Sequence, residues 1–205
     1  MRVELREGSC DSLAAHGAIP ISFVVRSVVD VVPAGFGYEL KERALPEWIK
    51  DYDAFIEDRP DRLADRFDVA RWRIISAWLE GARIGGAVLA WSAPGVTMLE
   101  DRTDLAVVWD LRVDPRVRGR GVGRSLWESA ERWARSRGCT TIKVETQDTN
   151  VGACRFYERM GCTLRGVHRN AYPEALEEVQ LLWYKDLASD PNWKKHGLSG
   201  GMPSG

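Results

Sequence analysis

The chain has 205 residues, 44% of them hydrophobic, and a formal net charge of −1 at pH 7. This length and apolar content suit one domain with a sizeable core, and the near-neutral charge speaks against a general nucleic-acid or membrane-surface binder. The chain has no run of about 18 apolar residues, so we expect no membrane-spanning helix. The start, "MRVELREGSC", contains Glu4 and Glu7 and lacks the apolar stretch of a signal peptide, which indicates a cytoplasmic protein.

The cysteines and histidines are few and scattered, and the cysteines show no CxxC spacing. This usage predicts reduced thiols and no metal site. The residues are Cys10, Cys139, Cys154 and Cys162, with His16, His168 and His196.

Charge is unevenly distributed along the chain. Between Asp30 and Asp68 there are 11 acidic and 6 basic residues, whereas between Arg112 and Lys143 there are 9 basic and 3 acidic residues. Either charged segment, considered alone, is adequately explained as a solvent-exposed face of the protein. Taken together, the two runs suggest an anionic ligand on the second half of the chain and a cationic one near the first.

The first elements follow an ambiguous segment over residues 1–20. Residues 21–32 are rich in β-branched side chains and predict a long strand, which the proline and glycines at 33–37 should end. Pro46 suits a first helical turn, and an apolar stripe with helical spacing then predicts a helix over 46–58. The stripe consists of Trp48, Ile49, Tyr52, Phe55 and Ile56.

The rest of the chain alternates between strand and helix patterns. Residues 62–67 predict a short helix, 72–91 a hairpin and 105–114 a strand. A helix over about 121–137 should end at Gly138. The pattern closes with a strand over 140–146, a helix over 151–160, and strands over 162–167 and 177–187.

The sequence "DPRVRGRGVGRS", residues 114–125, lies between a predicted strand and a predicted helix and holds four arginines and three glycines in nine positions. The first amides of a helix have no partner within it, and the helix dipole adds positive potential there. Glycines let an anion approach that backbone closely, so we expect a phosphate-binding loop. The spacing departs from the Walker A and GxGxxG patterns. It fits [RQ]xxGx[GA], with Arg118, Gly119, Arg120, Gly121, Val122 and Gly123 in the six places.

This loop and its context resemble the GNAT superfamily of N-acetyltransferases, in which the loop binds the pyrophosphate of acetyl-CoA. In that family a strand precedes the loop, a helix and a strand follow, and Asn-x-x-Ala-x-x-[FLY]-Tyr comes next. "NVGACRFY" supplies Asn150, Ala153, Phe156 and Tyr157 in those places. "ERMGC" then matches the usual Glu-x-x-Gly-Phe, with Cys162 in place of Phe.

The resemblance covers roughly residues 70–187, with weaker likeness back to about 21. It implies an α/β (α+β) GNAT acyltransferase fold, a mixed central sheet of six to seven strands that splay at the acetyl-CoA cleft and are flanked by helices. We therefore expect a single domain over 21–187, an N-terminal segment over 1–20 and a flexible tail over 188–205.

The resemblance also implies how acetyl-CoA is held. The strand before the loop should pair with the pantetheine amides as an added strand would, and Asn150 should bind the pantetheine arm, cap its helix, or do both. Tyr157 should donate a proton to the departing thiolate, unless it is simply a core tyrosine. The expected cofactor-binding residues are Leu111, Arg112, Val113, Arg118, Gly119, Arg120, Gly121, Val122, Gly123, Arg124, Ser125, Asn150, Ala153 and Tyr157.

The group that accepts the amine proton has two candidates. Asp110 lies amid apolar neighbours, where burying an unpaired carboxylate is energetically costly, so a functional role would account for its presence. Strand alternation places Asp110 on one face with Val108 and Arg112, unless a bulge intervenes. The non-catalytic alternative is that Asp110 and Arg112 form an ion pair on the surface. Glu145 is the second candidate, and either carboxylate could bind a cationic substrate instead of taking its proton.

More specific likeness lies in "VWDLRVDP", "VETQDTNVGACRFY" and "EVQLLWYKDL", which resemble the streptothricin (nourseothricin) acetyltransferases. The implied substrate is a small cationic amine, and the implied role is antibiotic resistance. Trp48 and Tyr52, beside acidic residues, suit a cationic amine, although a packed amphipathic helix explains them as well.

Several alternatives stay open. The acceptor could be a polyamine, an aminoglycoside or a protein N-terminus, and the fold could serve a noncatalytic acyl-CoA-binding module. Nucleic-acid binding through the arginines is disfavoured by the overall charge. The assembly could be a homodimer.

Overall fold

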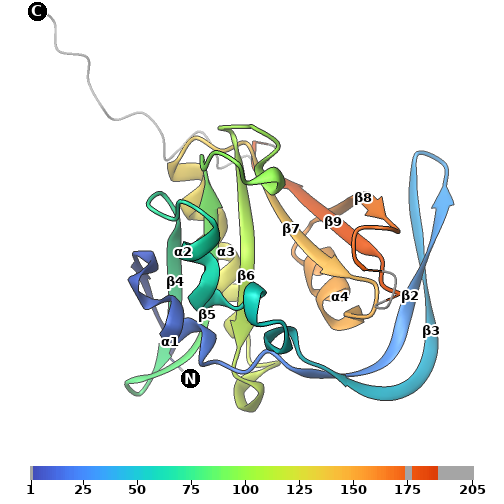
Figure 1. Ribbon diagram of the computed structural model, residues 1–205, viewed down its shortest axis with the longest axis horizontal. Helices are drawn as coiled ribbons and strands as arrows, with labels where there is room; N and C mark the ends of the chain where they lie inside the picture. Colours follow the sequence, from blue (N-terminus) through green and yellow to red (C-terminus); the bar gives the residue numbers. More distant parts are fainter. Residues whose placement is uncertain (1, 174–176, 189–205) are drawn as a thin grey trace, which may run out of the picture.

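The computed structural model describes residues 2–173 and 177–188, and at its centre is a seven-stranded mixed sheet in the order β1-β4-β5-β6-β7-β9-β8 (Figure 1). Within these residues β6 and β7 run parallel and the other neighbours run antiparallel. The strands are β1 (Glu4–Gly8), β4 (Arg73–Leu79), β5 (Ala82–Trp91), β6 (Leu105–Val113), β7 (Thr141–Gln147), β8 (Thr163–His168) and β9 (Gln180–Asp186). The predicted mixed sheet flanked by helices is confirmed.

The helices cover both faces of this sheet. α3 (Val122–Ser136) and α4 (Val151–Arg159) bury their apolar faces in the larger core, whereas the short α1 (Leu13–Gly17) and α2 (Leu63–Arg66) cover a smaller core on the other face. Gly138 adopts a positive φ of 77° just after α3, as expected of a helix-ending glycine. The predicted hairpin over 72–91, the short helix and both long helices are confirmed.

The sheet opens between its two parallel strands. β6 and β7 pair from Leu105 and Thr141 as far as Val108 and Val144, and beyond that point they diverge (Figure 1). α3 lies behind β5 and β6, whereas α4 lies beside β7, so the opening runs between the two long helices as well. This divergence creates the space for a ligand.

The segment before α2 differs from the prediction. Of the residues expected to form a helix over 46–58, those up to residue 50 continue a strand and the rest form only short turns. β2 (Phe23–Ala34) and β3 (Gly37–Lys50) form a long separate hairpin that turns at Gly35, and two short 3-10 turns follow at Tyr52–Ala54 and Ile56–Asp58. Pairing between the two strands outweighs the helical spacing of the apolar residues.

Exposure in that segment explains the error. Ile49 and Ile56 are 71% and 63% exposed, so the predicted apolar stripe has no core to face. Pro46 is accommodated at a register irregularity, where Val25 pairs with Trp48 but Ser27 pairs with Ala44. A two-stranded ribbon tolerates proline at such a place because no ladder hydrogen bond is lost.

The N-terminal residues that the sequence left ambiguous are ordered into the fold. β1 pairs with β4 at the edge of the sheet, and Leu13 and His16 of α1 are buried. The tail expected over 188–205 lies, apart from Ala188, outside the described residues. Within the described ranges, no helix combines the length and the apolar character that crossing a membrane requires.

Candidate active site

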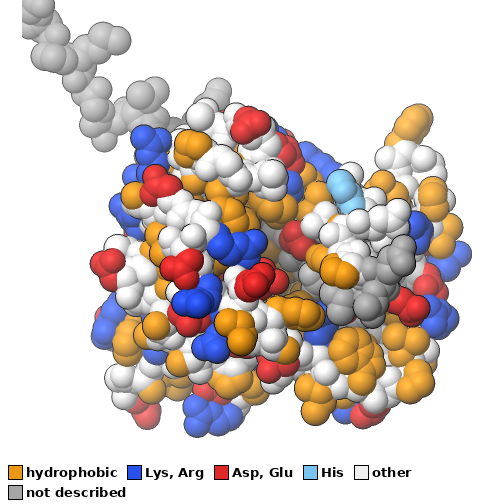
Figure 2. Space-filling view, viewed as in Figure 1, with side chains coloured by type: hydrophobic (Ala, Val, Ile, Leu, Met, Phe, Trp, Pro, Cys, Tyr) orange, Lys and Arg blue, Asp and Glu red, His pale blue; other side chains and the backbone are white. Residues whose placement is uncertain are grey.

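A cleft of about 1050 Å³ opens where β6 and β7 diverge. Its walls are the second half of β6, the loop before α3, the end of β7, the first turns of α4 and the inner edge of the β2–β3 hairpin. In the space-filling view the surface is hollowed between the part over β6 and the part that carries the hairpin and β9 (Figure 2). The cleft therefore joins the predicted phosphate loop to the predicted carboxylates.

The loop before α3 presents bare backbone to the cleft. Gly119 and Gly121 have positive φ values of 76° and 86°, and a Cβ added at either would meet open space. The first helical hydrogen bond runs from Ser125 N to Gly121 O, so the amides of residues 122–124 precede the hydrogen-bond ladder of α3. This arrangement suits an anion at the positive end of a 15-residue helix.

The arginines of the loop have different environments. Arg118 lines the cleft, but its guanidinium donates to the carbonyls of Val113, Pro20 and Ser22, so it clamps the loop to the N-terminal segment. Arg124 is largely exposed and lies 3.9 Å from Glu128, which leaves its charge available at the rim. Arg120 is exposed but does not line the cleft.

A bulge in β6 sets which side chains face the cleft floor. Val88 pairs with Asp110 but Leu89 pairs with Val108, so Trp109 is the extra residue. The predicted alternation, with Val108 on the same face as Asp110 and Arg112, is therefore wrong, because a bulge interrupts the strand at Trp109. Val108 belongs to the larger core on one face of the sheet, whereas Asp110 and Arg112 contact α1 and the turn after β3 on the other.

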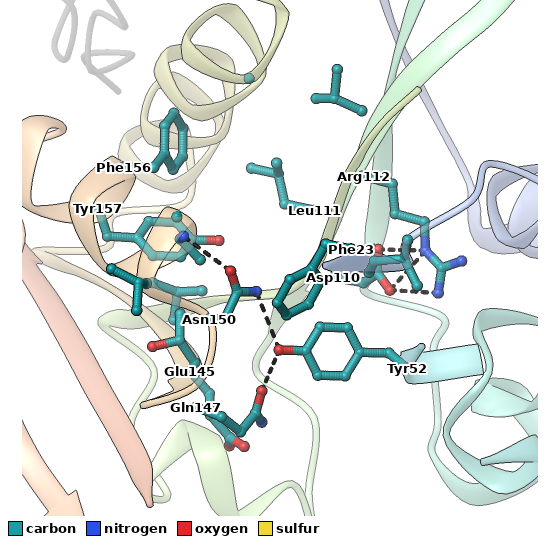
Figure 3. A pocket seen from close by; sticks show the side chains of 18 of the residues that line it. Phe23, Tyr52, Asp110, Leu111, Arg112, Glu145, Gln147, Asn150, Phe156 and Tyr157 are labelled. Atoms are coloured by element: carbon teal, nitrogen blue, oxygen red, sulfur yellow. Dashed lines mark hydrogen bonds and ion pairs between the residues drawn. The ribbon is translucent and has the colours of Figure 1, made fainter. Parts of the chain in front are cut away.

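Asp110 is the centre of a network of charged groups, of which Figure 3 shows the contacts with Arg112. Its carboxylate accepts from Arg112 Nε at 3.0 Å and from His16 Nε2 at 2.7 Å, and its side chain is 12% exposed. Arg112 in turn binds both oxygens of Asp53. Burial acts to raise the pKa of Asp110, but the hydrogen bonds and charges of His16 and Arg112 outweigh it and hold the pKa below its usual value. The pair with Arg112 is thus buried, not a surface pair.

Glu145 faces the cleft from β7 in a contrasting environment. Tyr172 donates to its Oε1 at 2.5 Å and Gln180 to its Oε2 at 2.8 Å. Burial raises its pKa above the usual value, and these two hydrogen bonds offset only part of the effect. The negative charge of Asp58, another residue of the cleft wall, acts in the same direction.

Tyr157 lies on the α4 side of the cleft, against Trp127 and Phe156, with ring centroids 5.2 Å and 5.1 Å away. Burial raises its pKa well above the usual range, so the hydroxyl keeps its proton. Figure 3 shows its ring directed into the space between Phe156 and Asn150. The structure therefore places a protonated tyrosine hydroxyl on the cleft wall.

Asn150 caps α4 and also contacts the opposite wall. Its Oδ1 accepts from Ala153 N at 3.1 Å, and its Nδ2 donates to the hydroxyl of Tyr52 at 3.2 Å. Tyr52 also donates to Gln147 (Figure 3). The cap is present as expected, and Tyr52 holds the amide nitrogen.

Other predicted residues divide between the cleft and the rest of the molecule. Tyr52 lines the cleft, whereas Trp48 lies on β3 opposite Val25, is 43% exposed and does not line it. Of the acids between Asp30 and Asp68, Glu42 and Asp58 line the cleft. Besides Arg118 and Asn150, the residues of the predicted cofactor-binding set that line the cleft are Leu111, Arg112, Val113, Gly119, Gly121, Val122, Gly123, Arg124, Ala153 and Tyr157.

Sequence reasoning assigned no role to His16 or Tyr172, and it considered Asp53 only as one of the acidic residues beside Trp48 and Tyr52. Each reaches the site from a segment that carries no recognisable motif: the ambiguous N-terminus, the turn after β3 and the loop before β9. Among the described residues, no group of three or more His, Cys, Asp or Glu side chains could hold a metal ion, and the four cysteines are free.

Comparisons with known proteins agree with this geometry. The sequence model of the Acetyltransferase (GNAT) family matches residues 38–162. The chain is 32% identical to streptothricin acetyltransferase of Escherichia coli over 79% of this chain and 84% of that protein. It is 27% identical to streptothricin acetyltransferase of Streptomyces lavendulae over 81% of this chain and 84% of that protein.

Solved structures show the same fold. A Bacillus anthracis protein in complex with acetyl coenzyme A superposes with a TM-score of 0.72 at 26% identity, covering 90% of this chain and 99% of that one. A nourseothricin acetyltransferase superposes with a TM-score of 0.70 at 26% identity, covering 91% and 99%. The family match over more than half of the sequence, together with a relative that is 32% identical across most of both chains, shows that this chain belongs to the GNAT family of acetyltransferases.

Proposed function

We propose that the protein transfers the acetyl group of acetyl-CoA to a primary amine of a small, multiply charged substrate of the streptothricin type, and so confers resistance to such antibiotics. The observation that carries the proposal is the cleft itself, with a glycine-rich helix start at one end and Asp58, Asp110 and Glu145 at the other. The relatives named for streptothricin and the homologous structure with bound acetyl-CoA support it. The reaction is assigned to the cytoplasm.

The donor would lie along the loop and β6. Backbone amides of residues 122–124 would meet the pyrophosphate, and Arg124 would add positive charge at the rim. The segment of β6 beyond Val108 no longer pairs with β7, so its backbone is free of that partner and suits a pantetheine arm added as a strand would be. The thioester would then lie near Asp110 and Tyr157.

The two carboxylates would have different tasks. Asp110 has a lowered pKa and stays ionised, which suits an anchor for the substrate ammonium; Glu145 has a raised pKa, which suits a base at near-neutral pH. Glu145 would take the proton of the amine as nitrogen attacks the thioester carbon. Tyr157 would donate its hydrogen to the departing sulfur, because its raised pKa keeps it protonated.

Aromatic side chains would complete the acceptor end. Phe55, Trp109 and Tyr172 line the cleft near the carboxylates. Trp109 is held edge-on by Phe67 at 5.0 Å and tilted against Trp72 at 5.1 Å, so its ring is fixed in place. Aromatic faces beside carboxylates suit an organic cation.

The test mixes purified protein with acetyl-CoA and a panel of amines, namely streptothricin, an aminoglycoside, a polyamine and a peptide N-terminus. Thiol release and product mass are measured. We expect streptothricin to gain one acetyl group at the highest kcat/KM. Preference for another amine overturns the acceptor assignment but not the acetyl transfer, and acetyl-CoA binding without thiol release for any amine indicates a noncatalytic module. Strong salt-dependent retention on DNA would favour the nucleic-acid alternative.

A further inference from the structure

A histidine from the N-terminal segment contacts the carboxylate that we assign to the substrate. His16 lies in α1, ahead of the residues matched by the family model, and its side chain is fully buried. Its Nε2 lies 2.7 Å from Asp110 Oδ1. Nothing in the proposed chemistry has used this group so far.

The neighbours of the ring determine which of its nitrogens donates to Asp110. Asp110 is an ionised carboxylate that can only accept, so His16 Nε2 carries the hydrogen and donates it. The other nitrogen, Nδ1, faces Arg83 Nη2 at 3.5 Å, and a guanidinium can only donate. Nε2 is therefore the nitrogen that donates to the carboxylate, and the ring lies between Arg83 and Asp110.

The sheet is built to leave room for this ring. A Cβ added at Gly86 of β5 would lie 2.6 Å from His16 Nδ1 and 3.2 Å from the carbonyl oxygen of Ile75. Real Cβ atoms do not approach other atoms so closely, so any side chain at this position would displace the imidazole. A substitution at Gly86 is thus a second, independent way to displace His16 experimentally.

Asp110 is held from two directions. Arg112, two residues along the same strand, contacts both oxygens of the carboxylate from one side, while His16 contacts Oδ1 from α1. Three N–H groups make these contacts, and Arg112 Nε–H is shared between the two oxygens, so about one of the roughly four lone-pair positions of the carboxylate is left as acceptor capacity. These donors also fix the plane in which that capacity points.

We propose that His16 is a positioning residue of the acceptor site, whose Nε2–H orients the carboxylate of Asp110 toward the ammonium group of the substrate. The proposal rests on the acetyl transfer and on the anchoring role of Asp110 proposed above. It makes α1 part of the active site, although α1 lies outside the cleft wall.

Three substitutions test the direction of the hydrogen bond. The amide nitrogen of glutamine can occupy the place of Nε2, the shorter asparagine reaches only the place of Nδ1, and leucine has no donor. We expect His16→Asn and His16→Leu to raise KM for the amine roughly tenfold, the size of one hydrogen bond to a charged group, with kcat and KM for acetyl-CoA little changed. His16→Gln should recover most of that loss, and His168→Leu, at an exposed histidine of β8, should have no effect.

A double-mutant cycle separates positioning from packing. In an Asp110→Asn background, His16→Asn should raise KM for the amine by less than twofold, because the group that it positions is already altered. An equal, roughly tenfold rise in both backgrounds, or equal KM changes for amine and acetyl-CoA, would show that His16 acts only through packing and would overturn the proposal. Gly86→Ala, which leaves both side chains intact, should reproduce the KM effect of His16→Asn and fail to add to it.

A spectroscopic measurement needs no activity. In protein labelled with ¹⁵N-histidine, Nε2 of His16 should carry a hydrogen, and Asp110→Asn should shift the Nε2 resonance. An Nε2 that carries no hydrogen, or a resonance that does not respond to Asp110→Asn, contradicts the contact itself. If the resonance behaves as expected but the wild-type protein acetylates no amine, the proposed function has failed and the His16–Asp110 contact stands as structural.

Discussion

Asp110 and Glu145 face one cleft from opposite walls because each lies just beyond the last paired position of its strand, Val108 in β6 and Val144 in β7. Divergence of two parallel strands separates the carboxylates and opens a space between them. Their surroundings push their pKa values in opposite directions, downward for Asp110 and upward for Glu145. A single topological feature thus supplies both an anion that stays charged and a carboxylate that can exchange a proton.

The division of roles predicts different kinetic defects. Glu145→Gln should lower kcat by roughly 10²–10⁴-fold because the base is lost, with partial recovery at high pH, where free amine is abundant. Asp110→Asn should instead raise KM for the amine roughly tenfold and leave kcat within about threefold, as expected for one charge-assisted contact. Steady-state kinetics across pH distinguish the two, and the reverse pattern would assign Asp110 as the base.

The phosphate loop can be tested with a matched pair of glycines. Gly121 and Gly81 have φ values of 86° and 81°, and a Cβ at either meets open space, but only Gly121 lies in the cleft. Alanine at such a φ costs about 1–2 kcal/mol at either position. Gly121→Ala should weaken acetyl-CoA binding at least tenfold in calorimetry, whereas Gly81→Ala should lose similar stability and keep its affinity. Equal acetyl-CoA affinities in the two variants would show that this loop does not bind the pyrophosphate.

Tyr157 provides a test of proton donation to sulfur. Tyr157→Phe keeps the ring that packs on Trp127 and removes the hydroxyl. We expect kcat to fall roughly 10²–10⁴-fold while acetyl-CoA affinity is largely retained. A variant with wild-type kcat would mean that the thiolate leaves unaided or with another donor.

Arg112 holds the floor of the cleft together. Its guanidinium joins Asp110, Asp53 and the carbonyls of Gly17 and Ile19, and its side chain is 1% exposed. Arg112→Met leaves two carboxylates without their cation, so unfolding by urea should show a loss of about 3–5 kcal/mol.

A surface ion pair serves as the control for Arg112. Arg43 pairs with Asp30 on the exposed hairpin, and Arg43→Met should leave the free energy of unfolding nearly unchanged. Similar losses in the two variants would mean that the network around Arg112 contributes nothing beyond an ordinary surface pair.

Local sequence patterns were enough to predict the β4–β5 hairpin, α3, α4 and the glycine-rich loop, because each depends on neighbours within a few residues. The segment over 46–58 was mispredicted because its apolar spacing fits a helix, while pairing with β2, fixed by residues about 20 positions earlier, selects a strand. The bulge at Trp109 likewise depends on β5 and cannot be read from β6 alone.

The candidate site divides in the same way. Motif positions such as Gly121, Asn150 and Tyr157 line the cleft where the sequence predicted them. The partners that tune the carboxylates, His16 and Tyr172, come from segments 94 and 27 residues away in the chain and have no local signature. Tertiary contacts of this kind are fixed only by the completed fold.

The pH dependence of the reaction should depend on Tyr172. A general base works only when deprotonated, so activity is present above the pKa of Glu145 and is lost as pH falls through it. Because burial raises that pKa, the acidic limb of kcat/KM should lie above the pH expected for an ordinary glutamate. Tyr172 donates to Glu145 at 2.5 Å and lowers its pKa, so Tyr172→Phe should move the limb to still higher pH.

The matched control for Tyr172 is a second tyrosine that donates to a carboxylate elsewhere. Tyr184 donates to Glu100 outside the cleft wall, so Tyr184→Phe removes the same atom and should leave the limb in place. The measurement is kcat/KM for the amine between about pH 5 and 9, with the denaturation midpoint followed at each pH to exclude unfolding. A limb that moves to lower pH in Tyr172→Phe, or that moves equally in both variants, would mean that the titrating base is not Glu145. Under that outcome, Asp110 would be assigned as the base only if Asp110→Asn also abolished the acidic limb. Its lowered pKa places the titration of Asp110 at a lower pH than that of an ordinary aspartate.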